Sequence, residues 1–292
     1  MTDILYIGDY AYSTWSLRGW LFFDAFGLSK KTIMVPFGEG QTVAEQLTDD
    51  VKIARTVPCV ALKDGAVVWD SMAIGEELAS RHPDAGLWPK EPKMRALARS
   101  LAAEMHSGFT ALRTQCPMNV RLAYSDVPID DALDADLARL QDIWHYALDV
   151  SGGPWLAGEY SIADAFFAPV AGRIAGFSLP VSERCMDYVQ RHLNHGPFRR
   201  WRSMGFAKPD VLPWYVQPYE TVPWPGPALA DAEVVDTGPA ANELCPYSGK
   251  PVTHFLTYAG RTWGVCNAFC RDKTVADPEA WPAFMKMVQA TP

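Results

Sequence analysis

The sequence has no long hydrophobic run, and this excludes one class of protein. Its most apolar stretches, Gly19–Phe26 and Ala163–Val170, are much shorter than the roughly 20 residues that a helix needs to cross a bilayer. Thr2 and Asp3 follow the first Met without a basic and then an apolar segment, so we expect no signal peptide. We therefore expect a cytoplasmic protein with no membrane partner.

An excess of positive charge is also lacking. The formal net charge is -8 at pH 7, so we expect no broad attraction to nucleic acid, although a local basic pocket for a small anion is compatible with this charge. The 292 residues are 49% hydrophobic and 21% charged, which is typical of a folded chain with a well-developed core. This length predicts two domains with room for a small third domain.

Apolar runs and turn signals over residues 1–82 predict a thioredoxin-like α/β domain. Short hydrophobic runs bounded by Gly or Asp indicate strands, and Asp64-Gly65 between two such runs indicates a hairpin. A hydroxyl residue before an apolar stretch and a glycine after it are typical of a helix. The predicted order is β-α-β-(α)-β-β-α, with strands at Ile4–Ile7, Thr32–Val35, Val60–Leu62 and Val67–Trp69 and with helices from Ser13 to Gly27 and from Asp70 to about Arg81.

The pattern changes after a linker at 82–89. Residues 90–206 predict an all-α helical-bundle domain, because Lys93–Gln115 and Asp130–Val150 carry apolar residues at helical spacing without a proline. Ser161 and Asp164 form a capping-box pattern in front of a further apolar helix. Residues 207–243 are dense in proline, so we expect a linker that forms neither helix nor strand. Residues 244–292 predict a small α+β module of their own.

The start of the first helix lacks the cysteines of thioredoxin-like redox proteins. Ser13-Thr14-Trp15-Ser16 stands where a Cys-x-x-Cys would profit from the helix dipole and the free N–H groups. Disulfide exchange by this segment is therefore excluded. The Ser13 hydroxyl is instead suited to donate a hydrogen bond to the thiolate of a bound ligand, which favours ionisation of that thiol. The alternative is that Ser13 only caps the helix.

Two further dipeptides have the chemistry of a peptide-binding site. Val57-Pro58 precedes a strand where this fold carries a cis-proline, and such a bond turns the backbone of Val57 outward toward a peptide-like ligand. Asp70 is suited to accept a hydrogen bond from an α-amino group. Ser71 adds a hydroxyl and a helix N-terminus for a carboxylate. A capped helix and an ordinary turn are the alternative at each place.

With these motifs, residues 1 to about 206 resemble the glutathione transferase superfamily. The serine-type transferases, zeta-like and related bacterial groups, are the nearest, although Trp15 replaces the cysteine of zeta enzymes. The resemblance implies that Ser13 activates the glutathione thiol. It further implies that Val57 and Pro58 bind the cysteinyl backbone, that Asp70 and Ser71 hold the γ-glutamyl end, and that the protein is a homodimer. For the glycyl carboxylate of glutathione, Gln41 and Lys52 are both candidates.

The resemblance also implies a pocket for a small electrophilic substrate beside the first helix. Tyr12 and Trp15 make this pocket aromatic, together with Tyr10. On the helix that follows residue 93, the candidates to line it are Met105, His106, Arg113 and Gln115. Arg113 or Arg121 is a candidate to bind an anionic group of the electrophile, and a solvated or salt-bridged arginine is the alternative.

The six cysteines are unevenly distributed, and half of them lie close to the C-terminus. Cys245 precedes a predicted hairpin, and Cys266 and Cys270 follow it at a helix start. Three thiolates suit zinc or another soft metal, and His254 is a candidate fourth ligand. The segment resembles the small YHS/TRASH-type metal-binding modules, which implies metal binding by the three cysteines. A module with idle thiols is the alternative.

Two interpretations of the whole chain remain. The first is a glutathione transferase that conjugates the activated thiol to, or adds it across, a small electrophile. The second is a non-catalytic glutathione- and metal-responsive binding protein, because a fold does not fix a function. A glutathione-dependent isomerase is a further alternative within the first class.

Overall fold

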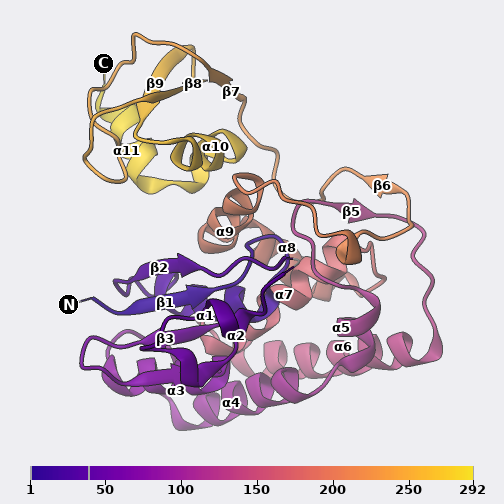
Figure 1. Cartoon of the computed structure of the whole chain (residues 1–292). Helices are drawn as coiled ribbons and strands as arrows, with labels where there is room; N and C mark the ends of the chain where they lie inside the picture. The colour runs from indigo at the N-terminus through magenta and orange to yellow at the C-terminus, as the bar shows by residue number, and fades with distance from the viewer. Residues whose placement is uncertain (1, 39, 292) are drawn as a thin grey trace. The chain divides into compact units, whose positions relative to one another are not determined.

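The computed structural model describes residues 2–38 and 40–291, and the chain forms two compact units (Figure 1). The first unit contains Met1–His192 and Leu212–Pro225, and the second contains Leu193–Val211 and Gly226–Pro292. Within the part of the chain that the structure describes, no helix is both long and apolar enough to span a membrane.

The first unit begins with a thioredoxin-like α/β domain. Its sheet has the order β2-β1-β3-β4, in which β1 and β2 are parallel and the other pairs are antiparallel. The predicted order of elements is confirmed, and Gly65 takes the positive φ that the hairpin turn requires. The elements are β1 (Ile4–Ile7), α1 (Thr14–Asp24), β2 (Lys31–Met34), α2 (Val43–Gln46), the 3-10 turn η1 (Lys52–Ala54), β3 (Cys59–Ala61), β4 (Val67–Trp69) and α3 (Ser71–Arg81).

Helix α1 is buried along most of its length because it contacts β1, α3 and the helical domain. Leu17, Leu21 and Phe22 are fully buried, as expected of a helix that is apolar nearly all round. A Cβ atom at Gly19 would lie 2.9 Å from Cβ of Pro58. A glycine is therefore required where α1 passes the loop that carries Val57 and Pro58.

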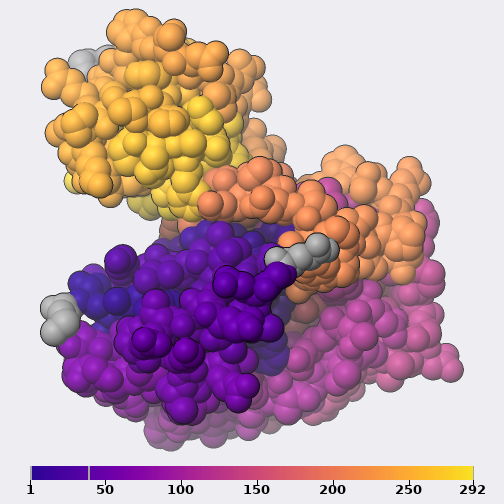
Figure 2. Space-filling model, viewed as in Figure 1, coloured from indigo at the N-terminus to yellow at the C-terminus, as the bar shows by residue number. Residues whose placement is uncertain are grey.

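The rest of the first unit is mainly helical. Helix α7 is buried throughout and contacts α1 and α4, so it joins the helical domain to the α/β domain, which lie directly against each other in Figure 2. Ser161 and Asp164 form the predicted capping box at its start. The helices are α4 (Pro92–Ser107), α5 (Thr110–Gln115), α6 (Asp131–Ser151), α7 (Ile162–Gly176) and α8 (Glu183–Asn194).

The prediction of one helix over Lys93–Gln115 is wrong. The helix ends at Ser107, because Gly108 leaves the helical conformation and Phe109 takes a φ of 55°. Helix α5 then starts in a new direction. This break places Arg113 on a separate short helix.

The prediction that residues 207–243 form neither helix nor strand is also wrong. Strand β5 (Ala123–Tyr124) pairs with β6 (Thr221–Val222), and Pro213–Tyr215 form a 3-10 turn, η2. Strand β7 (Ala232–Val235) pairs with β8 of the second unit. Both strands lie in proline-free stretches between the prolines, where the backbone N–H groups needed for a ladder are present.

The second unit is a small α+β module. A hairpin of β8 (His254–Tyr258) and β9 (Arg261–Val265) pairs with β7, and α9 (Gly196–Phe206) packs against α10 (Ala268–Ala276). A 3-10 turn, η3 (Pro278–Ala280), and α11 (Pro282–Ala290) complete it. Arg199 of α9 donates two hydrogen bonds to Asp277, at 2.7 and 2.8 Å. The second unit thus includes α9, which we had expected in the helical domain. The domain limits drawn from the sequence stay a prediction.

Candidate active site

Ser13 lies at the N-terminus of α1 and is both a helix cap and part of a cavity wall. Its Oγ accepts a hydrogen bond from the Ser16 N–H and donates one to Ser16 Oγ at 2.8 Å. Ser16 Oγ in turn accepts from the Gly8 N–H at 2.8 Å. The Ser13 side chain is buried, with 4% of its surface exposed. Its hydroxyl proton must turn away from Ser16 to reach a ligand.

A cavity of about 270 Å³ lies between the loop before β3 and the start of α3. The Val57–Pro58 bond is cis, as predicted. Asp70 caps α3 by accepting a hydrogen bond from the Met72 N–H at 2.7 Å. Ser71 Oγ is buried and has no hydrogen-bond partner among the described residues. The residues that line this cavity are Trp15, Thr56, Val57, Pro58, Asp70, Ser71 and His106.

His106 belongs to this cavity, whereas we had expected it in the electrophile pocket. Its Nε2 lies 3.3 Å from Asp70 Oδ2, and its Nδ1 is buried without a partner among the described residues. Burial lowers the pKa of His106, and the charges of Arg18 and Arg113 lower it further, against the opposing effect of Asp70. Burial and the neighbouring arginines therefore disfavour the charged imidazolium.

A second cavity of about 430 Å³ adjoins the first, since Trp15 and Val57 line both. Ser13, Tyr12 and Arg113 line it, and Tyr12 and Arg113 are among the residues that the sequence suggested for an electrophile pocket. The guanidinium groups of Arg18 and Arg113 lie over the Trp15 ring, 4.4 and 4.8 Å from its centroid. The other lining residues are Thr14, Phe37, Thr110, Thr114, Pro117, Met118, Arg173 and Tyr215.

Two residues of this cavity wall, Tyr215 and Arg173, and one residue behind Trp15, Arg18, were not among the pocket candidates from the sequence. Tyr215 comes from the proline-rich segment and stacks on Tyr12, with ring centroids 4.5 Å apart. Arg173 projects from α7, and burial lowers its pKa to about 10. Arg18 is fully buried on α1. A single arginine within the apolar helix α7 is the one signal that sequence inspection offered for Arg173.

Several predicted candidates lie elsewhere. Gln41 is exposed, and its backbone carbonyl accepts a hydrogen bond from the Gln46 side chain. Gln115 donates to Asp130. Arg121 donates to the Tyr12 hydroxyl and does not line the cavity. Of the remaining candidates, Tyr10 and Met105 are buried without lining either cavity, and Lys52 forms an exposed ion pair with Asp49.

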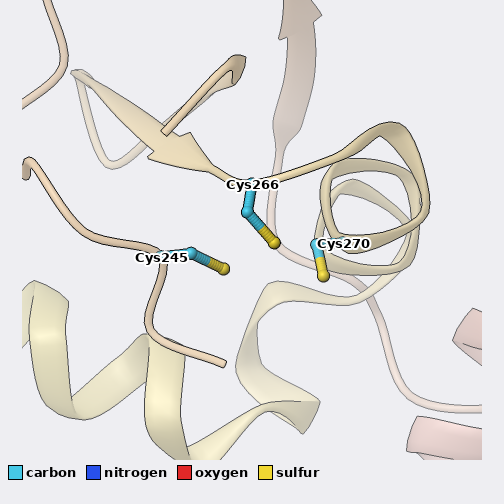
Figure 3. Close-up of side chains that lie close together, drawn as sticks. All are labelled: Cys245, Cys266 and Cys270. Carbon is cyan, nitrogen blue, oxygen red and sulfur yellow. The ribbon is translucent and has the colours of Figure 1, made fainter. Parts of the chain in front are cut away.

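The second unit brings the three C-terminal cysteines together. Their Sγ atoms all lie within 4.8 Å of one another and point toward a common centre (Figure 3). Cys245 lies in a loop, Cys266 directly follows β9, and Cys270 lies on α10. Ser248 Oγ donates to Cys266 Sγ at 3.2 Å. His254 lies outside the group, and its Nδ1 is hydrogen-bonded to the Thr253 hydroxyl.

The donor set fits a zinc ion. A Zn–S bond of about 2.3 Å in tetrahedral geometry places the sulfurs about 3.8 Å apart, so a contraction of about 1 Å or less would close the group around a metal. Burial raises the pKa of the Cys270 thiol to about 12, and the neighbouring thiols add to this because like charges repel. A bound cation removes that repulsion.

Comparison with known proteins relates the N-terminal part of the chain to glutathione transferases. Residues 12–81 match the family described as the N-terminal domain of glutathione S-transferase. A probable maleylacetoacetate isomerase from Caenorhabditis elegans is 38% identical over 69 residues. That alignment covers 24% of this chain and 32% of the relative, so the chain matches about a third of that protein.

Solved structures extend the likeness to the fold of the helical domain. A glutathione transferase homologue from Burkholderia, crystallised with bound glutathione, has a TM-score of 0.54 at 22% identity and covers 70% of this chain and 98% of its own. A glutathione transferase from Methylococcus capsulatus gives a TM-score of 0.51 at 23% identity, with the same coverage. The omega 3C transferase of Trametes versicolor gives 0.52 at 17% identity, over 69% of this chain and 88% of its own. The fold is therefore that of glutathione transferases.

Proposed function

We propose that the protein is a glutathione-dependent enzyme in which Ser13 activates the glutathione thiol for addition to a small electrophile. The observation that carries this proposal is the junction of the two cavities. One is lined by Val57, Asp70 and Ser71, and the other by Ser13 and aromatic side chains. The relatives named above, one of them crystallised with glutathione, support glutathione as the ligand.

Each residue of the first cavity then has a role toward glutathione. The backbone of Val57 pairs with the cysteinyl unit, as a peptide strand would. Asp70 accepts from the α-amino group. Ser71 and the α3 N–H groups receive the γ-glutamyl carboxylate, which supplies the partner that the buried Ser71 hydroxyl lacks. Holding both substrates in adjoining cavities contributes to the rate through proximity.

Thiol activation requires that Ser13 donate a hydrogen bond to the thiolate. Ser16 can reverse its hydrogen bond with Ser13 and donate to Ser13 Oγ, which frees the Ser13 proton for the ligand. Each unit by which the thiol pKa falls corresponds to about 1.4 kcal/mol. In a conjugation the thiolate forms a C–S bond and the leaving group departs with its electron pair. In an isomerisation the C–S bond forms and later breaks, and glutathione is released unchanged.

The test compares Ser13→Ala with wild type. We expect the ultraviolet absorbance of the bound thiolate to shift to higher pH, and conjugation to fall about 10- to 100-fold. Glutathione itself should still bind, because Val57, Asp70 and Ser71 remain. Ser100→Ala, which removes an exposed hydroxyl from α4, is the matched control. An unchanged thiol titration in Ser13→Ala would overturn the proposal.

A second candidate function rests on the thiol group of the second unit. We propose that Cys245, Cys266 and Cys270 hold a zinc ion, with the fourth position left to water or to an added ligand. The closeness of the three sulfurs supports this. The metal content of the purified chain, measured by mass spectrometry, should be one zinc per chain and should fall to background in Cys266→Ser. Glutathione binding without turnover, together with that zinc, would favour the glutathione- and metal-responsive binding protein.

The homodimer is proposed from the same relationship, because transferases of this fold often form dimers. Sedimentation equilibrium tests it directly, and a single species of monomer mass at micromolar concentration would contradict it. Placement in the cytoplasm stays a prediction from the sequence.

A further inference from the structure

Three arginines meet at the second cavity from three different helices. Arg113 of α5 and Arg173 of α7 line the cavity, and Arg18 of α1 lies buried beside them, with its guanidinium over Trp15 and Phe166. The charges of Arg113 and Arg173 each lower the pKa of Arg18, although burial is the larger cause. The three positive charges therefore act on one another.

Among the described residues, backbone carbonyls and not carboxylates accept the hydrogen bonds of Arg113 and Arg173. Among the described residues that line the cavity, none is acidic. Arg113 donates only to the carbonyls of His106 and Gly108, at 3.4 Å, and Arg173 donates to the carbonyls of Cys116 and Pro169. Nε and Nη1 of Arg18 are buried and have no hydrogen-bond partner among the residues that the structure describes. Asp70, at the first cavity, is the acidic group that acts on Arg18.

Buried charges without a counter-charge are costly, and a cluster of like charges is more so. Such a cluster at the wall of a cavity is stabilised when an anion enters. Arginine is also the side chain best suited to hold a carboxylate through two parallel hydrogen bonds. The arginines thus supply the positive charge and the N–H donors that a bound carboxylate needs.

The other residues of the cavity wall restrict the chemical class of the ligand further. Tyr12, Trp15, Phe37 and Tyr215 line the same cavity, and aromatic walls favour a flat, unsaturated molecule. A volume of about 430 Å³ is in the range of small-molecule sites. Ser13 lies on the wall as well, so the reacting carbon of such a molecule would face the activated thiol.

From these observations we infer that the electrophile is a flat, unsaturated or aromatic carboxylic acid, whose carboxylate is held by Arg113 and Arg173 with Arg18 behind them. This inference rests on the proposed function, because it names the substrate class of the same site. It differs from the expectation drawn from sequence in two respects. Arg173 and Arg18 are added, and Arg121 is removed, since its guanidinium is bonded to Tyr12 outside the cavity wall.

The test uses one pair of substrates, chloronitrobenzoate and its methyl ester, of which only the first carries a negative charge. With either, the glutathione thiolate forms a C–S bond to the aromatic carbon and chloride leaves. We expect kcat/KM of the wild type to favour the acid by about 10- to 100-fold once the intrinsic reactivity of each is subtracted, as expected for a charge-assisted contact. Arg113→Gln should lose most of this preference, so that its ratio of acid to ester approaches the intrinsic ratio.

Matched variants keep the test decisive. Arg139→Gln removes one positive charge from an exposed ion pair with Glu104 and should leave the preference for the acid unchanged. Arg173→Lys is paired with Arg113→Gln because Arg173 is buried and its loss can impair folding. Inhibition or direct calorimetric binding of nitrobenzoate, which needs no turnover, should weaken about 10-fold or more in both cavity variants.

The outcomes separate the two proposals. Equal use of acid and ester by the wild type, with nitrobenzoate binding unaffected in Arg113→Gln, overturns the inference and leaves the proposed function standing. Weaker glutathione binding in Arg113→Gln, with an unchanged ratio of acid to ester, would assign the arginines to the glycyl carboxylate of glutathione and also overturns it. If neither substrate is conjugated, the proposed function fails, and nitrobenzoate binding alone then decides the inference.

Discussion

His106 Nε2 and Asp70 Oδ2 lie 3.3 Å apart, which joins α4 of the helical domain to the turn before α3 of the α/β domain. Burial lowers the pKa of His106, which disfavours the charged ring beside this carboxylate. The two side chains contact each other at the edge of the cavity that we assign to glutathione. His106 is therefore a positioning residue for the proposed ligand site.

Replacing His106 by Phe should weaken glutathione binding about 3- to 10-fold, because Asp70 loses a polar contact of about 1 kcal/mol. The pKa of the bound thiol should not change, because Ser13 is untouched. Isothermal calorimetry and the thiolate absorbance measure the two effects separately. His82→Gln, at the other end of α3, serves as the control, and equal affinities in all three proteins would contradict the role of His106.

The same lowered pKa predicts how acid acts on the fold. The folded state holds the His106 proton less tightly than the unfolded chain does, so acidification below about pH 6.5 favours unfolding. Urea unfolding of wild type and of His106→Phe, followed between pH 5 and 8, should show a smaller loss of stability on the acid side in the variant. A loss of the same size in both would contradict the assignment.

Asp164 predicts a pH dependence of the opposite sign. This buried carboxyl accepts hydrogen bonds from Leu156, Ser161 and Tyr188, yet burial raises its pKa to about 6. The folded state therefore binds this proton more tightly than the unfolded chain, and its contribution to stability is full below about pH 4 and lost as pH rises through 6. The stability difference between wild type and Asp164→Asn should be about 1.4 kcal/mol larger at pH 5 than at pH 8. Urea titrations at the two pH values measure it.

The ion pair of Arg199 and Asp277 predicts a large effect confined to the second unit. Both side chains are mostly buried, with 17% and 6% exposed. Arg199→Met leaves a buried carboxylate without its partner and should cost about 3 kcal/mol of unfolding free energy. Arg184→Met breaks an exposed pair with Asp149 and should cost less than about 1 kcal/mol. A cost for Arg199→Met as small as that of Arg184→Met would show that the pair is dispensable.

If the thiol group holds zinc, a chelator should lower the thermal midpoint of the second unit and leave the first unit unchanged. The reason is that a metal bound only in the folded state adds its binding free energy to stability. Tryptophan fluorescence of Trp263 and Trp281, which belong to the second unit, reports the transition. Cys185→Ala, which alters a thiol of the first unit, should respond to the chelator as wild type does. An unchanged midpoint in wild type would contradict the zinc site.

Much of the fold follows from the sequence because its signals are local. The Asp64-Gly65 hairpin and the Ser161 capping box each depend on residues within a few positions of one another. The helix break at Phe109 was missed, because a positive φ at a phenylalanine has no signature in the residue type. Arg173 and Arg18 meet only when α7 packs on α1. No short segment of the sequence contains both arginines, so local patterns could not reveal their contact.

Tyr215 has a further consequence, for the order in which a ribosome completes the protein. The chain leaves the first unit after His192, returns to it for Leu212–Pro225 and leaves again, so the wall of the second cavity is unfinished when α8 emerges. Helix α9 is then synthesised before its partners α10 and η3 exist. Until these later segments are synthesised, the apolar face of α9 is exposed to solvent. A chaperone that binds exposed apolar surfaces would bind the nascent chain at this helix.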